Sequence, residues 1–311
     1  MARNVRIASI APAPRPIEKK KPGQTSAEMI CDWLRRNIEQ VLPDRPDLIV
    51  LPEACDQPSG ITHEEVIQYY EERGSLVLDY VRSVARENHC YVAYGAVRKA
   101  EDGVLYNSCT MIDRRGEIVG YYDKNYPTVY EDGVLPGECE MVFECDFGRV
   151  GAIICFDLNF EEMRGKYKQA GVDVVLFLSM FGGGVMRNFF AYDTQSYFVA
   201  ACANASPAEI ISPLGESVGS SSNYHNYVVR DINLDCKVCH LDFNWEKIRA
   251  AKKKYGTKLQ MRDPGYVGVV LLSYEGEDRT ILDVIREFEI ETADEYFARS
   301  RAHREQYLPK D

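Results

Sequence analysis

The sequence predicts an α/β fold in which mixed sheets are covered by helices. Short apolar runs rich in strand formers alternate with longer stretches of helical periodicity, as in βαβ units. Other apolar runs are joined by short polar turns, a pattern typical of antiparallel hairpins. Each apolar strand needs helical cover, so these observations together favour helices packed over a mixed sheet. The chain has 311 residues, a length that α/β folds reach as one unit.

The first hundred residues contain two successive strand–helix units. We expect strands at residues 5–10, 47–51 and 90–97, and helices at about 25–42 and 63–88. Thr25 suits a helix cap and Glu28 places an acid in the first turn. Gly74 interrupts the second helix. Pro52 and Glu53 end the second strand, so Glu53 lies just past its carboxyl end.

The middle of the chain combines a hairpin with further strand–helix units. Residues 107–112 and 117–122 flank a turn at 113–116, and Lys124 leaves the second of these strands. Residues 150–154 form an apolar strand that runs directly into Cys155. We expect helices at 160–170 and 186–196, and further strands at 172–178, 197–204, 210–222 and 227–233.

The domain organisation predicted from these patterns is one large domain at residues 1–280 and a charged segment at 281–311. This segment has many charges and few apolar residues, which favours a peripheral position or an arm onto another subunit.

Composition excludes several classes of protein. Hydrophobic residues make up 45% and charged residues 27%, as in ordinary globular proteins. No apolar run approaches the roughly 20 residues that span a bilayer, and the first residues lack a signal-peptide core. We therefore expect a cytoplasmic protein without membrane contact. The net charge of −11 argues against nucleic acid as a partner. The basic stretch at 247–258 is interpreted as a solvated helix face.

The ten cysteines are interpreted as reduced thiols rather than a disulfide framework. They are spread through a long chain, and several lie in apolar, strand-like runs. Cys236 and Cys239, followed by His240, resemble a haem attachment or half of a zinc site. No second pair of ligands completes such a site, so we expect two packed thiols and no metal.

Three reactive side chains lie at comparable places in the predicted fold. Glu53, Lys124 and Cys155 each follow the end of an apolar strand. The carboxyl ends of strands collect the ligand site in open α/β sheets, so residues distant in sequence can converge there. Glu53, Lys124 and Cys155 are therefore the candidate catalytic residues.

The segments around these residues resemble the nitrilase superfamily of carbon–nitrogen hydrolases. Leu51-Pro52-Glu53, the segment from Lys124 and Cys155-Phe156-Asp157 occur in the order found in that family, and the resemblance covers roughly residues 5–235. It implies a four-layer αββα sandwich, commonly extended across a dimer, and a Glu-Lys-Cys catalytic set without metal or organic cofactor. The expected partners are a small amide, carbamoyl or nitrile substrate and a homodimer or higher homo-oligomer.

These residue types suit covalent catalysis by a thiol. A free thiol with a pKa of about 8.5 is mostly protonated at neutral pH and gains from an adjacent base, here Glu53. Lys124 and the backbone N–H after Cys155 could stabilise the negative charge that attack on an amide or nitrile creates. Glu131 resembles the family's second glutamate and is expected to orient Lys124 or the substrate, or to tune Glu53.

Departures from the family pattern bear on the substrate. Phe156 and Asp157 differ from the Cys-Trp-Glu of true nitrilases and resemble the amidase and carbamoylase branches, although Asn159 and Glu161 depart from those too. Amide or N-carbamoyl hydrolysis is therefore favoured over nitrile hydrolysis. Acyl transfer to an amine and a non-catalytic binding protein on the same fold stay open. The residues expected to bind substrate are Tyr126, Tyr130, Phe156, Asn159, Met180 and Phe181.

Overall fold

The computed structural model describes residues 1–12, 20–203 and 206–308. Its contacts divide the chain into two compact units, one formed by Val5–Asp231 and the other by Met1–Asn4 with Ile232–Asp311. No helix within these described ranges is both long enough and apolar enough to cross a membrane.

The larger unit contains two six-stranded mixed sheets. The first has the order β12-β1-β2-β3-β4-β5, with β1, β2 and β3 parallel and β3, β4 and β5 antiparallel. Its strands are β1 Asn4–Ile10, β2 Leu48–Val50, β3 Tyr91–Lys99, β4 Leu105–Ile112, β5 Ile118–Asp123 and β12 Tyr227–Asn233. The hairpin predicted around residues 113–116 is β4 and β5, and Lys124 follows β5 directly.

The second sheet has the order β11-β10-β9-β8-β7-β6. Its central strands β7, β8 and β9 are parallel, and the outer strands pair antiparallel. Its strands are β6 Val142–Cys145, β7 Gly148–Ile154, β8 Val174–Ser179, β9 Tyr197–Cys202, β10 Glu209–Ile211 and β11 Ser217–Ser220. The strand predicted at 197–204 ends earlier, and residue 204 lies outside the described residues.

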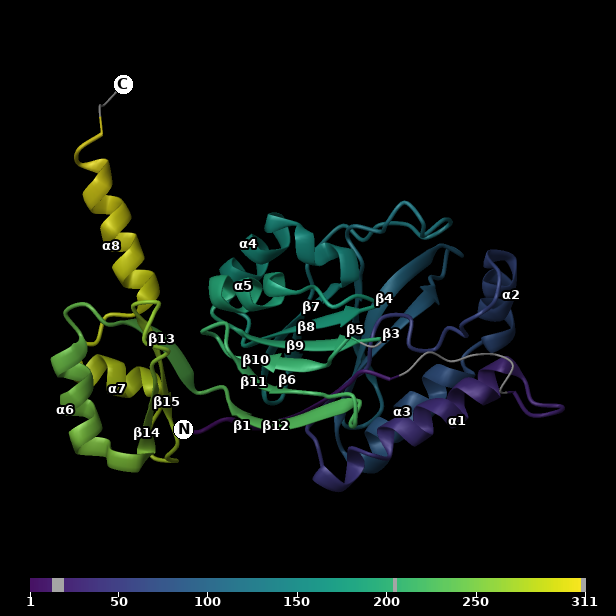
Figure 1. The fold of residues 1–311 in the computed structure, drawn as a ribbon, viewed down its shortest axis with the longest axis horizontal. Helices are drawn as coiled ribbons and strands as arrows, with labels where there is room; N and C mark the ends of the chain where they lie inside the picture. Colours follow the sequence, from purple (N-terminus) through teal and green to yellow (C-terminus); the bar gives the residue numbers. More distant parts are fainter. Residues whose placement is uncertain (13–19, 204–205, 309–311) are drawn as a thin grey trace. The chain divides into compact units, whose positions relative to one another are not determined.

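The two sheets pack face to face, as the ribbon view shows (Figure 1). Ser9 Oγ in β1 donates to the carbonyl oxygen of Ala200 in β9 at 2.8 Å. Gly95 in β3 lies where a Cβ would be 2.3 Å from the Pro52 carbonyl oxygen and 2.9 Å from Leu178 Cδ2 in β8. The absence of a side chain at Gly95 therefore lets the sheets and the segment before Glu53 approach each other.

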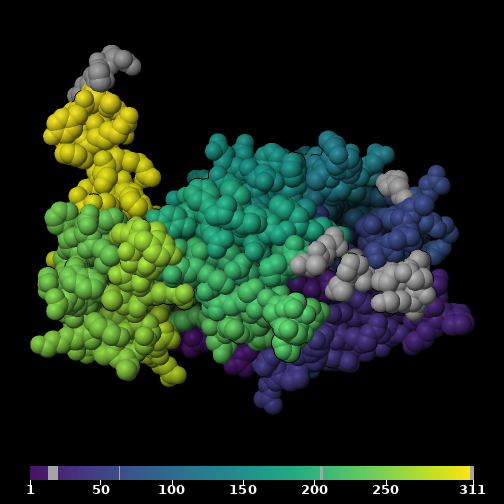
Figure 2. Space-filling model, viewed as in Figure 1, coloured from purple at the N-terminus to yellow at the C-terminus, as the bar shows by residue number. Residues whose placement is uncertain are grey.

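Helices cover both outer faces. The helices α1 Ser26–Ile38, α2 His63–Arg73 and α3 Leu76–Asn88 lie on the first sheet, and α4 Glu161–Ala170 and α5 Val185–Thr194 lie on the second. Leu34 and Val81 are buried in one core with Val92 of β3, and the ring of Tyr167 in α4 packs on Gly151 of β7. The space-filling view shows the α4 and α5 layer as a teal surface (Figure 2). The predicted αββα sandwich is confirmed.

The sequence signals for helix ends hold in this unit. Thr25 accepts from the backbone N–H of Glu28, whose side chain accepts in return from the Thr25 N–H, so the predicted start of α1 is a complete capping box. Gly74, with φ of 51°, separates α2 from α3 as expected. The short 3-10 helices η2 Leu42–Asp44 and η3 Cys155–Asn159 follow α1 and β7.

The smaller unit is built on a three-stranded antiparallel sheet of order β13-β15-β14. Its elements are β13 Cys236–His240, α6 Trp245–Tyr255, η4 Gly256–Lys258, β14 Leu259–Arg262, β15 Val269–Tyr274, α7 Ile281–Phe288 and α8 Ala293–Glu305. Cys236 and Cys239 on β13 form no disulfide. Over the described ranges no group of three His, Cys, Asp or Glu side chains is arranged to hold a metal ion.

The boundary between the compact units lies between Asp231 and Ile232, whereas the sequence pattern placed a boundary near residue 280. Residues 232–280 supply the sheet on which α7 packs. Ile281, Val284 and Ile285 of α7 are buried in the core of this unit. The first part of the charged segment is therefore an integral element. Contact of this segment with another subunit stays a prediction.

We expect Gly95→Ala to destabilise the larger unit by about 1–3 kcal/mol, because the added methyl group forces β3 away from Pro52 and Leu178. Gly165→Ala is the matched control. Gly165 lies in α4 with open space around its Cα, so alanine there should be neutral or stabilising. Chemical denaturation of both variants measures the difference. Equal stability of the two variants would contradict the proposed close approach of the sheets.

Candidate active site

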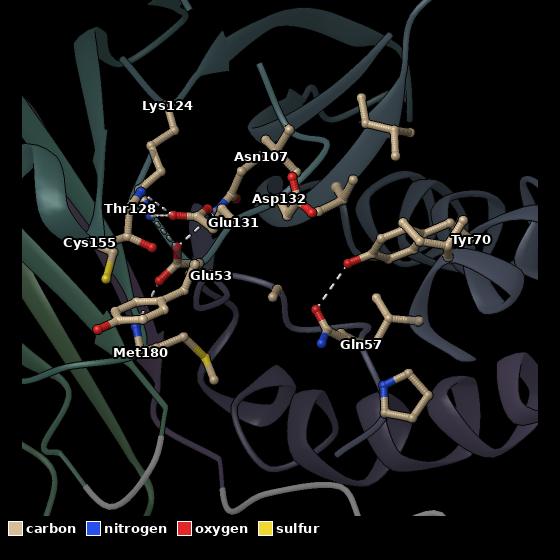
Figure 3. A pocket seen from close by; sticks show the side chains of 18 of the residues that line it. Glu53, Gln57, Tyr70, Asn107, Lys124, Thr128, Glu131, Asp132, Cys155 and Met180 are labelled. Atoms are coloured by element: carbon tan, nitrogen blue, oxygen red, sulfur yellow. Dashed lines mark hydrogen bonds and ion pairs between the residues drawn. The ribbon is translucent and has the colours of Figure 1, made fainter. Parts of the chain in front are cut away.

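A cavity of about 470 Å³ opens beside the ends of β2, β5 and β7 in the larger unit (Figure 3). Glu53, Lys124 and Cys155, which the sequence analysis selected, all line it, and so does Glu131. The structure therefore brings together Glu53 and Lys124, which are 71 residues apart in the chain, and Cys155, which follows Lys124 by 31 residues. The other residues that line the cavity are mainly apolar and include Pro58, Ile61, Val66, Ile67, Tyr70, Val97, Leu105 and Val134.

Glu53 is buried, and both of its carboxylate oxygens accept hydrogen bonds. Oε1 accepts from Lys124 Nζ at 2.9 Å and from Asn107 Nδ2 at 2.8 Å. Oε2 accepts from the backbone N–H of Met180 at 3.0 Å. Three donors, one in β4 and two directly after β5 and β8, thus hold this carboxylate in one orientation.

The ammonium group of Lys124 lies between two carboxylates. Its side chain is 1% exposed, and Nζ is 2.9 Å from Glu53 Oε1 and 2.7 Å from Glu131 Oε2. Burial by itself lowers the pKa of Lys124, but the charge of Glu53 and the hydrogen bond to Glu131 outweigh it and raise that pKa above its usual value. Lys124 is therefore a permanent cation in this site.

Glu131 comes from the turn that follows β5. Its Oε2 accepts from Lys124 Nζ and from the backbone N–H of Thr128 at 2.8 Å, and its Oε1 accepts from Asn107 Nδ2 at 2.7 Å. Burial favours its neutral form, yet the bonds from Lys124, Thr128 and Asn107 prevail and lower the pKa of Glu131. This carboxylate therefore stays ionised and contributes to the fixed charge of the site.

Asn107 is the site residue that the sequence reasoning missed. It lies in β4 and its carboxamide donates to both glutamates. The sequence signal was an amide at the start of the first strand of the predicted hairpin, and that signal does not identify the partners of Asn107.

Cys155 has an unusual backbone conformation at the end of β7. Its φ of 50° lies in the left-handed region, which non-glycine residues seldom adopt and which is often found at functional sites. The turn directs the half-buried thiol to the cavity wall beside Glu53 and Lys124 (Figure 3).

Electrostatics around Cys155 favour its protonated form. Burial and, after it, the charge of Glu53 raise the pKa of the thiol to about 12, although Lys124 and the Met180 N–H act in the opposite direction. The resting thiol is therefore neutral and needs a base in order to react.

Asp157 ties the turn at Cys155 to the segment that carries Lys124. Its Oδ2 accepts from the Ile154 N–H at 2.9 Å and from Tyr122 Oη at 2.7 Å, and its Oδ1 accepts from the Tyr126 N–H at 2.8 Å. Burial raises the pKa of Asp157 to about 6, although these three bonds favour the carboxylate. One buried side chain thus links the ends of β5 and β7.

The loop that follows Glu53 has a separate anchor. Asp56 is fully buried, forms an ion pair with Arg73 of α2 and accepts from Tyr94 Oη at 2.6 Å. Ala54, next to Glu53, has φ of 44°. The buried pair therefore supports a loop whose backbone is locally strained.

The six residues expected to bind substrate divide into two groups. Met180 and Tyr130 line the cavity, and Tyr130 is 89% exposed. Tyr126, Phe156, Asn159 and Phe181 are not among the residues that line it. Tyr126 stacks on Phe160 at a centroid distance of 3.6 Å, and Phe181 packs against Phe177. Further lining residues that the sequence did not indicate are Gln57, Ser59, Thr128 and Asp132.

A sequence model of the carbon–nitrogen hydrolase family matches residues 6–233, which is nearly the whole of the larger unit. The chain belongs to the carbon–nitrogen hydrolase family. This membership confirms the resemblance to the nitrilase superfamily. The chain is 23% identical over 228 residues to omega-amidase NIT2 of Xenopus tropicalis, covering 64% of this chain and 80% of that protein.

Two solved structures share the fold of this carbon–nitrogen hydrolase. Nit3 of Saccharomyces cerevisiae, a member of branch 10 of the nitrilase superfamily, has a TM-score of 0.63 at 15% identity, covering 74% of this chain and 90% of that one. A point mutant of the amidase from Nesterenkonia sp. AN1, which shows covalent addition of the acetamide moiety of fluoroacetamide at its active-site cysteine, has a TM-score of 0.63 at 17% identity. That match covers 74% of this chain and 90% of the amidase.

We expect Glu53→Gln to lower the pKa of the Cys155 thiol, because the Glu53 charge raises it in the native protein. Lys124→Met should raise that pKa, because the Lys124 charge lowers it. The measurement is thiolate absorbance at 240 nm between about pH 9 and 12, taken as the difference from the same protein carrying Cys155→Ser. Shifts of the same sign in both variants would contradict the electrostatic account.

Proposed function

We propose that this carbon–nitrogen hydrolase cleaves an amide or N-carbamoyl group of a small molecule through a thioester on Cys155. The observation that carries the proposal is the buried Lys124 ammonium held between Glu53 and Glu131 beside a neutral thiol in a cavity. This arrangement supplies a base, a cation and a nucleophile, the three groups that acyl transfer to sulfur requires.

In the first step Glu53 Oε2 takes the proton of the Cys155 thiol while sulfur attacks the carbonyl carbon of the substrate. The electron pair of the C=O bond moves to oxygen. Lys124 uses two of its three N–H groups on the glutamates within the described residues, so one remains for this oxygen. The backbone N–H of Phe156 is the second donor that we propose.

In the second step protonated Glu53 gives its proton to the leaving nitrogen, the electron pair on oxygen re-forms the C=O bond, the C–N bond breaks, and ammonia or an amine departs. The acyl group stays on Cys155 as a thioester. Glu53 then takes a proton from water, the resulting hydroxide attacks the thioester, and the thiol leaves with the proton from Glu53. The carboxylic acid is released and the three side chains return to their starting states.

We expect Cys155→Ala to lower kcat for amide hydrolysis by at least about 10³-fold, since it removes the nucleophile. Glu53→Gln should lower kcat by about 10²–10⁴-fold because it removes the base. Cys145→Ala, which removes a free thiol on β6 that does not line the cavity, is the control and should leave kcat unchanged. Ammonia release from a panel of small amides is the measurement. Full activity of Cys155→Ala would contradict the proposal.

The charges of the cavity bear on the class of substrate that we propose. Its described lining carries the three carboxylates Glu53, Glu131 and Asp132 against the single cation Lys124, which both glutamates already bind. Asp132 has no ion-pair partner within the described residues. A substrate with its own carboxylate would meet repulsion there, whereas a neutral or amine-bearing amide would not. We therefore propose a neutral or cationic amide with an apolar chain.

We expect 5-aminopentanamide and pentanamide to have kcat/KM values at least about tenfold above that of glutaric acid monoamide, equivalent to about 1.4 kcal/mol of differential binding. Asp132→Asn should reduce this ratio of kcat/KM values, because it removes the cavity carboxylate that has no ion-pair partner within the described residues. Initial rates with the three amides at low ionic strength give the comparison. A preference for the carboxylate-bearing amide would contradict the proposed substrate class.

A further inference from the structure

Asn107 holds the two glutamates of the site together. Its Nδ2 donates one hydrogen to Glu53 Oε1 at 2.8 Å and the other to Glu131 Oε1 at 2.7 Å. Lys124 Nζ also donates to both carboxylates. Glu53, Lys124, Glu131 and Asn107 therefore form a closed ring of alternating acceptors and donors (Figure 3).

The side chain at position 107 must supply hydrogen-bond donors to both glutamates without adding charge to the site. Two carboxylates and one ammonium leave the ring with one negative charge, which Glu53 needs in order to act as a base. A second cation would cancel that charge, and a third carboxylate would favour protonation of one of the three acids. A carboxamide relieves the repulsion between the glutamates and leaves the net charge unchanged.

The orientation of the Asn107 side chain costs free energy, because it buries a polar atom without a hydrogen bond. Its Oδ1 is buried and has no hydrogen-bond partner within the described residues. Rotating the amide would place this oxygen against two carboxylates, so the network keeps Nδ2 there and leaves Oδ1 unsatisfied. Such a buried orphan acceptor is unusual and indicates a requirement other than stability.

Asn107 also positions Lys124 and determines which carboxylate oxygen of Glu53 is available as the base. Its backbone carbonyl accepts the N–H of Lys124 at 2.8 Å. Its side chain and Lys124 both donate to Glu53 Oε1, whereas Oε2 accepts the backbone N–H of Met180 and, among the described donors, retains a lone pair for the thiol. Oε2 is therefore the oxygen of Glu53 that is available to accept the thiol proton.

We propose that Asn107 is a positioning residue that keeps Glu53 ionised and directs its Oε2 to the Cys155 thiol. This inference rests on the proposed function, because it assigns Asn107 a task within the same reaction. Asn107 acts through Glu53 and touches no reacting atom.

Two substitutions test the role of Asn107. Asn107→Asp keeps the shape and adds a third carboxylate, so kcat/KM at pH 7 should fall by about 10²-fold and the acidic limb of the pH–rate profile should move to higher pH, with partial recovery of rate in alkali. Asn107→Leu removes the donors without adding charge, so its loss should not recover with pH. Asn37→Leu is the matched control, since Asn37 is a buried asparagine of α1 outside the cavity.

A second measurement separates this inference from the proposed function. The rate at which chloroacetamide alkylates Cys155, followed by peptide mass against pH, requires no amide turnover. Slower alkylation in both Asn107 variants, with a shift to higher pH in Asn107→Asp, supports the inference even if the native protein hydrolyses no amide tested. The inference would be overturned if both Asn107 variants had the alkylation rate and pH profile of the native protein. It would also be overturned if their rates fell no further than that of Asn37→Leu. Should Asn107→Asp fail to fold, Asn107→Leu decides.

Discussion

The site depends on one buried interaction, the ammonium of Lys124 held between the carboxylates of Glu53 and Glu131. Removing such charges from water costs several kcal/mol per ion, and only close, well-directed partners repay that cost. These partners are present in the site. The two ion pairs are 2.9 and 2.7 Å long, and the carboxylates also accept hydrogen bonds from Asn107, Thr128 and Met180. Loss of any one of Lys124, Glu53 and Glu131 would leave a buried charge without its partner. The fold must therefore bring all three side chains together.

The sandwich assembles the group because its members come from both sheets. Glu53, Asn107 and Lys124 follow or lie in strands of the first sheet, whereas Cys155 and Met180 follow strands of the second. The close packing at Gly95 brings the sheets together near Glu53. Asp157 joins the two sheets again near Cys155, through Tyr122 of β5 and the Ile154 N–H of β7. The same contacts that hold the sheets together thus fix the distance between base, cation and thiol.

The sequence was sufficient for those parts of the fold and site that local patterns encode. Apolar strands and helical stretches predicted mixed sheets covered by helices, whereas the αββα layering was implied by the resemblance to the nitrilase superfamily. Glu53, Lys124 and Cys155 could be selected because each lies just past the end of a strand and within a segment that carries this resemblance. Asn107 could not, because its partners are 54 and 24 residues away and only the folded sheet brings them together. Tyr126 and Phe181 were expected at the cavity, but each packs on another aromatic ring. Such loop contacts leave no periodic signal in the sequence.

The most direct test of the account is to trap the acyl group on the enzyme. The protein should be mixed with a small amide that it hydrolyses, quenched in acid within one turnover, digested and mapped by mass. We predict that the acyl mass is found on the peptide that contains Cys155 and on none of the peptides with the other nine cysteines. An acyl group on another cysteine, or turnover with no acylated peptide at any quench time, would contradict the account.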